Sequence, residues 1–553
     1  MPSPDLVIRG AAVYDGSGSA GRATDVAVHD GRIAVVGPAV ERGRTEIDAA
    51  GLALMPGIVD VHTHYDAQIT WDPTLSPSLA LGVTTAVMGN CGFGIAPCPA
   101  SLRDTMMKNL SVVEGMDLAA LRAGIRWDFE SFADYLGLLR RVKPYLNVAV
   151  FAGHSAVRTA VMGEDASGRR DPTPDELRRM QAIVRKALAT GAIGFASSFS
   201  PNHSGHGGRP MPSTIASEEE LRALVAPLGE AGKGVFMMAT GPRATPEFIE
   251  SLAAETRRPM FISTVLTMYN GARPELGLSY YERCAAALAR GNEVYIQTSC
   301  QPLTFDFTLK DPYLLLSHDA FARVQAARPE ELGAIYRDPA FRKRFRENLA
   351  APQPGILFYG DWSNVAAGGR AVTEIAAERG VDPLDCFFDL ALAEALETRF
   401  EATLFQNDDA GVAPLLRHHA GVIALSDAGA HLTFLCDAGF GLHLLAHWVR
   451  ETGTFTLAEA VRRLTADPAA KYRIRDRGRI APGQWADLLL FDPQAVGVSS
   501  LERVSDLPGG GTRVLRRPLG VHGVWVNGER VFDGERAVER AAGPGRVLNR
   551  FDA

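Results

Sequence analysis

The stretch MPGIVDVHTH, residues 55–64, decides how this chain is expected to fold. Its centre, Gly57 to Val61, is a short apolar run rich in β-branched residues, which is typical of a buried strand. His62 and His64 follow directly, and side chains two positions apart on a strand point to the same side. The two imidazoles should therefore leave the strand end together, at a spacing that suits one metal ion. An H-x-H pair also arises by chance, so the other strand ends decide between a metal site and coincidence.

The composition is that of an ordinary globular protein. The chain has 553 residues, 46% hydrophobic and 22% charged, and its formal net charge is -7 with no long run of one sign. This charge argues against nucleic acid and anionic membrane as partners. No apolar run reaches the roughly 18 residues that span a bilayer, and the N-terminus lacks the pattern of a signal peptide, so we expect a cytoplasmic protein. The six cysteines include no C-x-x-C pair, and most should be buried thiols.

Strand-like and helix-like segments alternate through the middle of the chain, which is typical of βα units around a parallel sheet. The eight expected strands are residues 57–61, 82–88, 146–151, 192–196, 234–238, 259–262, 293–297 and 421–425. Eight is the number that closes a (β/α)8 TIM-like barrel. About 120 residues separate the last two strands, so we expect an excursion at about 300–420 that covers the barrel mouth.

Two of the expected helices have recognisable patterns. In residues 174–190 apolar side chains recur at helical spacing. Ser217 and Glu220 form an S-x-x-E pattern, which predicts a capping box at the start of the following helix.

Both ends of the chain carry short strand patterns separated by turn residues. These are residues 6–8, 26–28 and 33–36 near the N-terminus, and 486–492 and 523–532 near the C-terminus, the last a hairpin around Asn527-Gly528. Neither end is long enough to form a sandwich alone. We therefore predict a small β-sandwich domain formed by residues 1–55 and 471–553 together, with the barrel of residues 56–470 inserted into it.

Residues with metal-binding chemistry stand at several expected strand ends, which form the site in such a barrel. After strand two, glycines flank the thiol of Cys91 in the stretch NCGFG, and thiolate is a good zinc ligand. His154 follows strand three, His203 and His206 follow strand four, and Asp427 and His431 follow strand eight. So many such residues in the same register are hard to explain by core packing.

These motifs resemble the amidohydrolase superfamily, and more narrowly its N-acyl-D-amino-acid deacylase (D-aminoacylase) branch, over nearly the whole chain. The matching features are PGIVDVHTH, the cysteine of NCGFG, GHSAVR at 153–158, GAIGF at 191–195, Ser426-Asp427 and RGRIAPGQWADLLLFDP at 477–493. The resemblance implies that His62, His64 and Asp427 hold one metal, with Cys91 as a ligand or bridge.

The chain departs from that branch at a second metal position. Members usually bring histidines from strands five and six, but here these ends read MMATG and ISTVL. We therefore expect one ion per chain, Zn²⁺ because thiolate and imidazole suit it. A second ion would need a replacement ligand from His154, His203, His206 or His431.

The resemblance implies metal-assisted hydrolysis of an amide C–N bond. Asp427 would act as general base and then as acid, and His154 would help the metal to stabilise the oxyanion. Expected substrate contacts are Arg158, His203, His206, Met238 and His431, with Arg209 and Arg370 as further candidates to hold a carboxylate. The substrate should be a small-molecule amide with an apolar group, first of all an N-acyl-D-amino acid. A ureide, ester or lactone stays open, as do homo-oligomerisation and a non-catalytic scaffold that has lost metal ligands.

Overall fold

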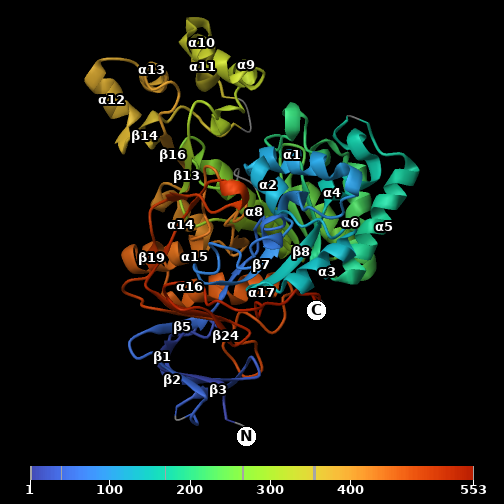
Figure 1. Cartoon of the computed structure of the whole chain (residues 1–553), viewed down its shortest axis with the longest axis vertical. Coiled ribbons are helices and arrows are strands. Elements are labelled where there is room, and N and C mark those ends of the chain that lie inside the picture. The colour runs from blue at the N-terminus through green and yellow to red at the C-terminus, as the bar shows by residue number, and fades with distance from the viewer. Residues whose placement is uncertain (1–2, 39, 169, 264–266, 353–355, 552–553) are drawn as a thin grey trace.

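The chain has an α/β fold around one eight-stranded parallel sheet with the order β6-β7-β8-β9-β10-β11-β12-β17 (Figure 1). The computed structural model describes residues 3–38, 40–168, 170–263, 267–352 and 356–551; residues 264–266 of the predicted strand-six end lie outside them. The strands are β6 (Ile58–Asp60), β7 (Val83–Met88), β8 (Asn147–Gly153), β9 (Gly194–Ser198), β10 (Val235–Ala239), β11 (Met260–Ser263), β12 (Val294–Thr298) and β17 (Gly421–Ile423). Each predicted strand of the middle region is confirmed as a member of this sheet.

The sheet curls so that its two outermost strands approach each other beyond their regular ends. The backbone N–H of His64 donates to the carbonyl of Ala428 at 2.7 Å, and Thr63 faces Ala428 in a parallel bridge. The residues that follow β6 and those that follow β17 therefore lie side by side, although more than 350 positions separate them in the sequence.

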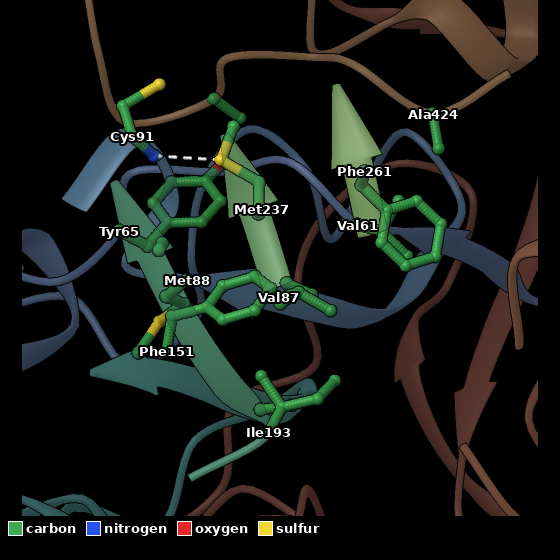
Figure 2. Packing of buried hydrophobic residues seen from close by; sticks show 14 of the residues in the cluster. Val61, Tyr65, Val87, Met88, Cys91, Phe151, Ile193, Met237, Phe261 and Ala424 are labelled. Atoms are coloured by element: carbon green, nitrogen blue, oxygen red, sulfur yellow. Dashed lines mark hydrogen bonds between the residues drawn. The ribbon is translucent and has the colours of Figure 1, made fainter. Parts of the chain in front are cut away.

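Helices follow the strands and pack around the sheet (Figure 1). They are α1 (Arg103–Val113), α2 (Leu118–Gly124), α3 (Phe132–Val142), α4 (His154–Met162), α5 (Pro174–Thr190), α6 (Glu218–Ala231), α7 (Pro246–Thr256), α8 (Pro274–Ala289), α14 (Asp409–Arg417), α15 (Phe440–His443), α16 (Leu457–Leu464) and α17 (Ala466–Lys471). Buried side chains of the strands form one large hydrophobic cluster, part of which Figure 2 shows. In the described part of the chain, no helix combines the length and the apolar character that crossing a bilayer requires.

The two helices with recognisable patterns form, but one of them differs in detail. The range predicted for α5 is confirmed, with Thr173 and Glu176 in a capping box before it. Ser217 caps α6 by accepting from the N–H of Glu220 at 3.1 Å, as predicted. The carboxylate of Glu220 does not return to the cap, so the predicted box is wrong. It is buried and contacts His154 and Arg158 instead, because two buried partners hold it more strongly than one exposed N–H.

The segment between β12 and β17 builds a substructure that we call the cap, from β13 to β16. Its elements are β13 (Leu303–Phe307), α9 (Ala322–Gln325), α10 (Leu332–Arg337), α11 (Pro339–Ala350), β14 (Val365–Ala367), β15 (Arg370–Ala371), α12 (Val372–Arg379), α13 (Pro383–Ala393) and β16 (Phe400–Phe405). The four strands form their own sheet in the order β13-β16-β14-β15, and the cap has a separate, strongly aromatic core. It stands above the parallel sheet in Figure 1.

Strands from both ends of the chain pair in one further sheet, at the opposite pole of the molecule (Figure 1). They are β1 (Leu6–Val13), β2 (Arg22–His29), β3 (Arg32–Gly37), β4 (Thr45–Asp48), β5 (Ala53–Pro56), β18 (Leu488–Phe491), β23 (Val521–Val526) and β24 (Glu529–Phe532). The two ends meet where β5 pairs antiparallel with β18. Since β5 runs almost directly into β6, this sheet fixes the start of the strand that carries His62 and His64.

Candidate metal centre

The thiol of Cys91 is positioned by a tight turn after β7. Gly89, Cys91 and Gly92 have φ values of 80°, 55° and 79°, in the left-handed region. A Cβ on Gly92 would lie 2.7 Å from the carbonyl oxygen of Ala196 on β9, so this position requires glycine. The N–H of Cys91 donates to the sulfur of Met237, 3.3 Å away (Figure 2). The turn is therefore packed tightly against β9 and β10, which restricts where the thiol can lie.

Asp427 follows β17 in a turn that also contains residues with φ in the left-handed region. The φ of Asp427 is 48° and that of His431 is 55°, while Gly429 between them has a φ of 94°. A Cβ on Gly429 would lie 2.6 Å from the carbonyl group of His64. A left-handed conformation costs a residue other than glycine roughly 1–2 kcal/mol, and such residues concentrate at functional sites. In this backbone conformation the carboxylate of Asp427 lies against the two histidines.

Four side chains converge at the ends of β6, β7 and β17. His62 Nε2 lies 3.2 Å from His64 Nε2, 3.6 Å from Cys91 Sγ and 3.0 Å from Asp427 Oδ1, and His64 Nε2 lies 3.4 Å from the same oxygen. The ligand atoms of His62, His64 and Cys91 all lie within 4.8 Å of one another. A tetrahedral Zn²⁺ with bonds of about 2.0–2.3 Å places its ligand atoms about 3.3–3.8 Å apart. The observed spacings are close to that, so His62, His64 and Cys91 fit one such ion, and the carboxylate of Asp427 lies within 3.4 Å of both imidazoles.

Each of the two histidines has a buried partner on its other ring nitrogen. His62 Nδ1 lies 2.7 Å from Gln297 Oε1 on β12, and the Gln297 amide in turn donates to Tyr472 Oη at 2.5 Å. His64 Nδ1 lies 3.0 Å from Glu114 Oε1, at the end of α1. Such partners fix the orientation of a metal-binding imidazole, because they hold the proton on the nitrogen that faces away from the metal. Both Nε2 atoms are thereby left facing the centre.

The buried groups shift one another's ionisation. Burial by itself raises the pKa of Asp427, but the two imidazoles outweigh it and hold that pKa well below its ordinary value. Burial lowers the pKa of His62, whereas Asp427 and Cys91 more than compensate and raise it to about 10. Burial likewise raises the pKa of Glu114, but His64 brings it below its ordinary value. Asp427 and Glu114 are therefore both carboxylates that face the histidines.

A cavity of about 850 Å³, counting the space at its open mouth, lies over these residues. Two groups of its lining residues differ in chemistry. We call the group His62, His64, Cys91, Glu114 and Asp427 the ligand side. We call the group Ala239, Ser263, Met268, Leu303, Phe305, Tyr313 and Leu357 the apolar side. Ala239 and Ser263 end β10 and β11, where the sequence lacks histidine, and the cap contributes Leu303, Phe305, Tyr313 and Leu357.

Of the predicted substrate contacts, the structure brings two to the cavity. His203 and His431 line it; His203 packs edge-on against Phe93 at 4.9 Å between ring centroids. Met238 does not line it, because successive residues of β10 point to opposite faces and its neighbours Met237 and Ala239 face the sheet interior. His206 is exposed and lies at a separate small cavity beside Asn109, so the loop turns it away from the metal centre.

His154 and Arg158 lie beside the centre but are directed away from the cavity. His154 is fully buried, with Nδ1 2.8 Å from Ser197 Oγ and Nε2 3.0 Å from Glu220 Oε1. The Arg158 guanidinium pairs with the other oxygen of Glu220. Both ring nitrogens of His154 are thus engaged within the fold. The role in oxyanion stabilisation that we predicted for His154 stays a prediction, and this placement does not favour it.

Sequence reasoning missed three residues that the fold brings to the centre. Glu114 and Gln297 hold the two histidines, and Tyr313 enters the cavity from the cap. Gln297 could have been recognised as a polar residue at the end of an apolar strand run. Glu114 and Tyr313 lie in segments with no distinguishing pattern, so only the tertiary contacts identify them.

Comparisons with known proteins agree with this geometry. The profile of the Amidohydrolase family matches residues 45–532. The chain is 29% identical to the D-aminoacylase of Alcaligenes xylosoxydans xylosoxydans over 569 residues, which cover 99% of this chain and 98% of the relative. It is also 29% identical over 574 residues to the N-acyl-D-aspartate deacylase of the same organism, with 99% and 96% covered.

Two solved structures show the same fold over their whole length. A D-aminoacylase, studied for one-metal activation and second-metal attenuation at its binuclear centre, has a TM-score of 0.66 and 27% identity, covering 99% of this chain and 100% of that one. The N-acyl-D-glutamate deacylase of Bordetella bronchiseptica, in complex with zinc and a phosphonate mimic of the tetrahedral intermediate, has a TM-score of 0.67 and 25% identity, with the same coverage. Because the family profile spans most of its length, the chain belongs to the amidohydrolase family.

Proposed function

We propose that this chain is a metal-dependent deacylase, which hydrolyses the amide C–N bond of an N-acylated amine to a carboxylic acid and an amine. The observation that carries the proposal is the convergence of His62, His64 and Cys91 at distances that fit one ion, with the Asp427 carboxylate 3.0 Å from His62. The relatives named above supply the first substrate class to test, the N-acyl-D-amino acids.

We assign the ion as a single Zn²⁺ held by these four residues. Imidazole and thiolate are ligands that zinc prefers. When bound, the ion polarises the scissile carbonyl and lowers the pKa of water towards about 7. A single ion is supported by the apolar side, where Ala239 and Ser263 offer no imidazole. One-metal activation is also named for a D-aminoacylase that shares this fold.

The chain's own residues would orient the ligands and move the proton. Gln297 and Glu114 hold the histidine rings with both Nε2 atoms towards the centre. The Asp427 carboxylate, at the mouth of the ligand side, would take a proton from the attacking water and deliver it to the leaving nitrogen. An amine leaves poorly unless it is protonated, so this transfer is essential to the reaction.

The same proposal extends to the architecture. We infer that the curled parallel sheet is a (β/α)8 barrel of residues 56–470, and that residues 1–55 and 471–553 form a small β-sandwich domain. The contact between His64 and Ala428 supports closure of the barrel, and the pairing of β5 with β18 supports the shared terminal domain.

Metal content and activity test the proposal together. The purified protein should contain about one equivalent of zinc per chain, and both His62→Ala and Cys91→Ala should lower that content. Removal of the ion by a chelator should abolish release of amine from N-acyl-D-amino acids and simple acylated amines, and added Zn²⁺ should restore it. Undiminished hydrolysis by the chelated protein would contradict the proposal, and a native protein without bound metal would favour a non-catalytic scaffold.

A further inference from the structure

The cavity has polar groups but no permanent cation. Among the described residues that line it, none is lysine or arginine. The apolar side presents Met268, Leu303, Phe305 and Leu357, and the polar lining outside the ligand side is hydroxyl, amide or imidazole. A free carboxylate on a bound small molecule is normally held by an arginine fork or a lysine. This cavity offers neither.

The three arginines that the sequence suggested for this purpose are engaged elsewhere. Arg158 is buried against Glu220. Arg209 is exposed and donates to the carbonyl of Glu164 at 2.9 Å. Arg370 is exposed on the cap and pairs with Glu378. None of the three lines the cavity.

Two further arginines lie near the cap strand that contributes to the cavity, but they face another direction. Arg399 and Arg503 both bind the carboxylate of Asp306, at 2.7 and 3.0 Å. Asp306 follows Phe305 on β13, and successive residues of a strand point to opposite faces. Because Phe305 faces the cavity, the two arginines lie on the far face of that strand.

His203, which lines the cavity outside the metal centre, does not replace a cation. His203 Nδ1 is 2.7 Å from Ser198 Oγ, and burial lowers the pKa of His203 to about 4. The ring is therefore neutral near pH 7, when it can offer one hydrogen bond but no charge.

The ligand side adds negative charge. Its acidic side chains are Cys91, Glu114 and Asp427. Like charges at this range repel strongly where water is excluded. A carboxylate from the substrate would lie beside these acidic side chains, with no lysine or arginine in the described lining to pair with it.

We propose that the cavity selects a neutral substrate: an acylated amine whose amine part is apolar and carries no free carboxylate. This rests on the proposed function, because it names the substrate class for the same metal centre. The apolar side would receive the amine part, while the scissile amide would lie at the ligand side. The specificity would thus differ from that of the acidic amino-acid deacylases to which the chain is similar.

A matched pair of substrates tests the inference. N-acetyl-D-leucine and N-acetyl-3-methylbutylamine differ only by the carboxylate, and amine release from each by the zinc-loaded protein gives kcat/KM. We expect the uncharged amide to be preferred by at least about tenfold. Binding is measured separately with the two ketone isosteres, in which CH₂ replaces the amide NH so that no turnover can occur. The uncharged ketone should bind more tightly, with the lower dissociation constant.

The outcomes separate this inference from the proposed function. Preference for the carboxylate in either measurement overturns the inference and leaves the hydrolase proposal standing. Failure of both amides to react, with tighter binding of the uncharged ketone, overturns the hydrolase proposal and supports the inference. Equal turnover and equal binding of both members also overturn the inference.

A substitution that adds a cation provides a second test. Met268→Lys places an ammonium group in the apolar side, and it should move the ratio of kcat/KM values towards N-acetyl-D-leucine by about tenfold. Met268→Leu is the neutral control and should keep the wild-type ratio. If both variants keep the wild-type ratio with metal bound, charge in the cavity does not set the specificity, and the inference fails; if the lysine variant does not fold, the wild-type comparison decides.

Discussion

The ligand side and the apolar side of one cavity both include residues at the ends of the same parallel sheet. They differ in the contacts that hold their side chains in place. On the ligand side, each of the two histidines has a polar partner behind it, Gln297 for His62 and Glu114 for His64. On the apolar side, Ala239 and Ser263 end their strands without a ligand, and the wall is completed by hydrophobic residues of the cap. In our proposals, binding of the metal is assigned to the ligand side and recognition of the substrate to the apolar side.

The largest effect is expected at the ligand side itself. Asp427→Asn keeps the size of the side chain but removes its basicity, so kcat should fall by about 10²–10⁴. The control variant is Ser263→Ala, which removes a hydroxyl group from the apolar side and should keep kcat within about threefold of the wild-type value. Thermal unfolding establishes that both variants are folded. An active Asp427→Asn variant would show that the proton moves through another group.

The partners behind the histidines should have an intermediate effect. Glu114→Gln and Gln297→Leu remove groups that orient imidazoles, and loss of such groups typically costs about 10–100-fold in metal affinity. Zn²⁺ affinity is measured by competition with a chelating dye. Ser263→Ala again serves as the control from the apolar side. If the two partner variants bind zinc with the affinity of the wild type, the histidines do not need their buried partners to bind the ion. The contrast drawn between the ligand side and the apolar side would then be wrong.

The apolar side should be the first half to loosen in acid. His318 in the cap donates from Nε2 to the carbonyl of Phe358 at 2.9 Å, and burial lowers the pKa of His318 from 6.5 to about 4. Between these two pH values, His318 is protonated in the unfolded chain but neutral in the folded cap. The free energy of unfolding of the cap should therefore decrease as the pH falls from about 6.5 towards about 4.

Hydrogen exchange of cap amides against those of the parallel sheet, at pH 7 and pH 4.5, measures this difference. His318→Gln removes the titrating group and should flatten the pH dependence of exchange in the cap. An equal acid response in wild type and variant would assign the effect to other groups.

The smallest effects compare two histidines of one loop. His203 lines the cavity and His206 does not. His203→Ala should change KM several-fold through loss of a polar contact, of about 0.5–1.5 kcal/mol. His206→Ala should leave kcat and KM unchanged. Steady-state kinetics on the same amide measure both, and a larger effect at His206 would place the substrate outside the cavity as we define it.

Much of the fold could be predicted from the sequence, because apolar runs and turn residues are local patterns. The eight parallel strands, α5 and the strands at both chain ends were found in this way. The failures have physical reasons. Glu220 fits a capping pattern, but burial beside His154 and Arg158 gives its carboxylate stronger partners. Met238 lies on β10, which ends at the cavity, yet its place in the alternation directs it away from the cavity.

The sequence alone determined which residues have metal-binding chemistry and that they follow expected strands, since both properties lie in short stretches around His62, Cys91 and Asp427. Only the tertiary structure decided which of them meet. The left-handed turns at Cys91 and Asp427, and the curling that joins β6 to β17, bring the ligand side together. The partners Glu114 and Gln297, and the cap residues of the apolar side, come from distant segments. Their roles depend on packing between elements, which no local pattern records.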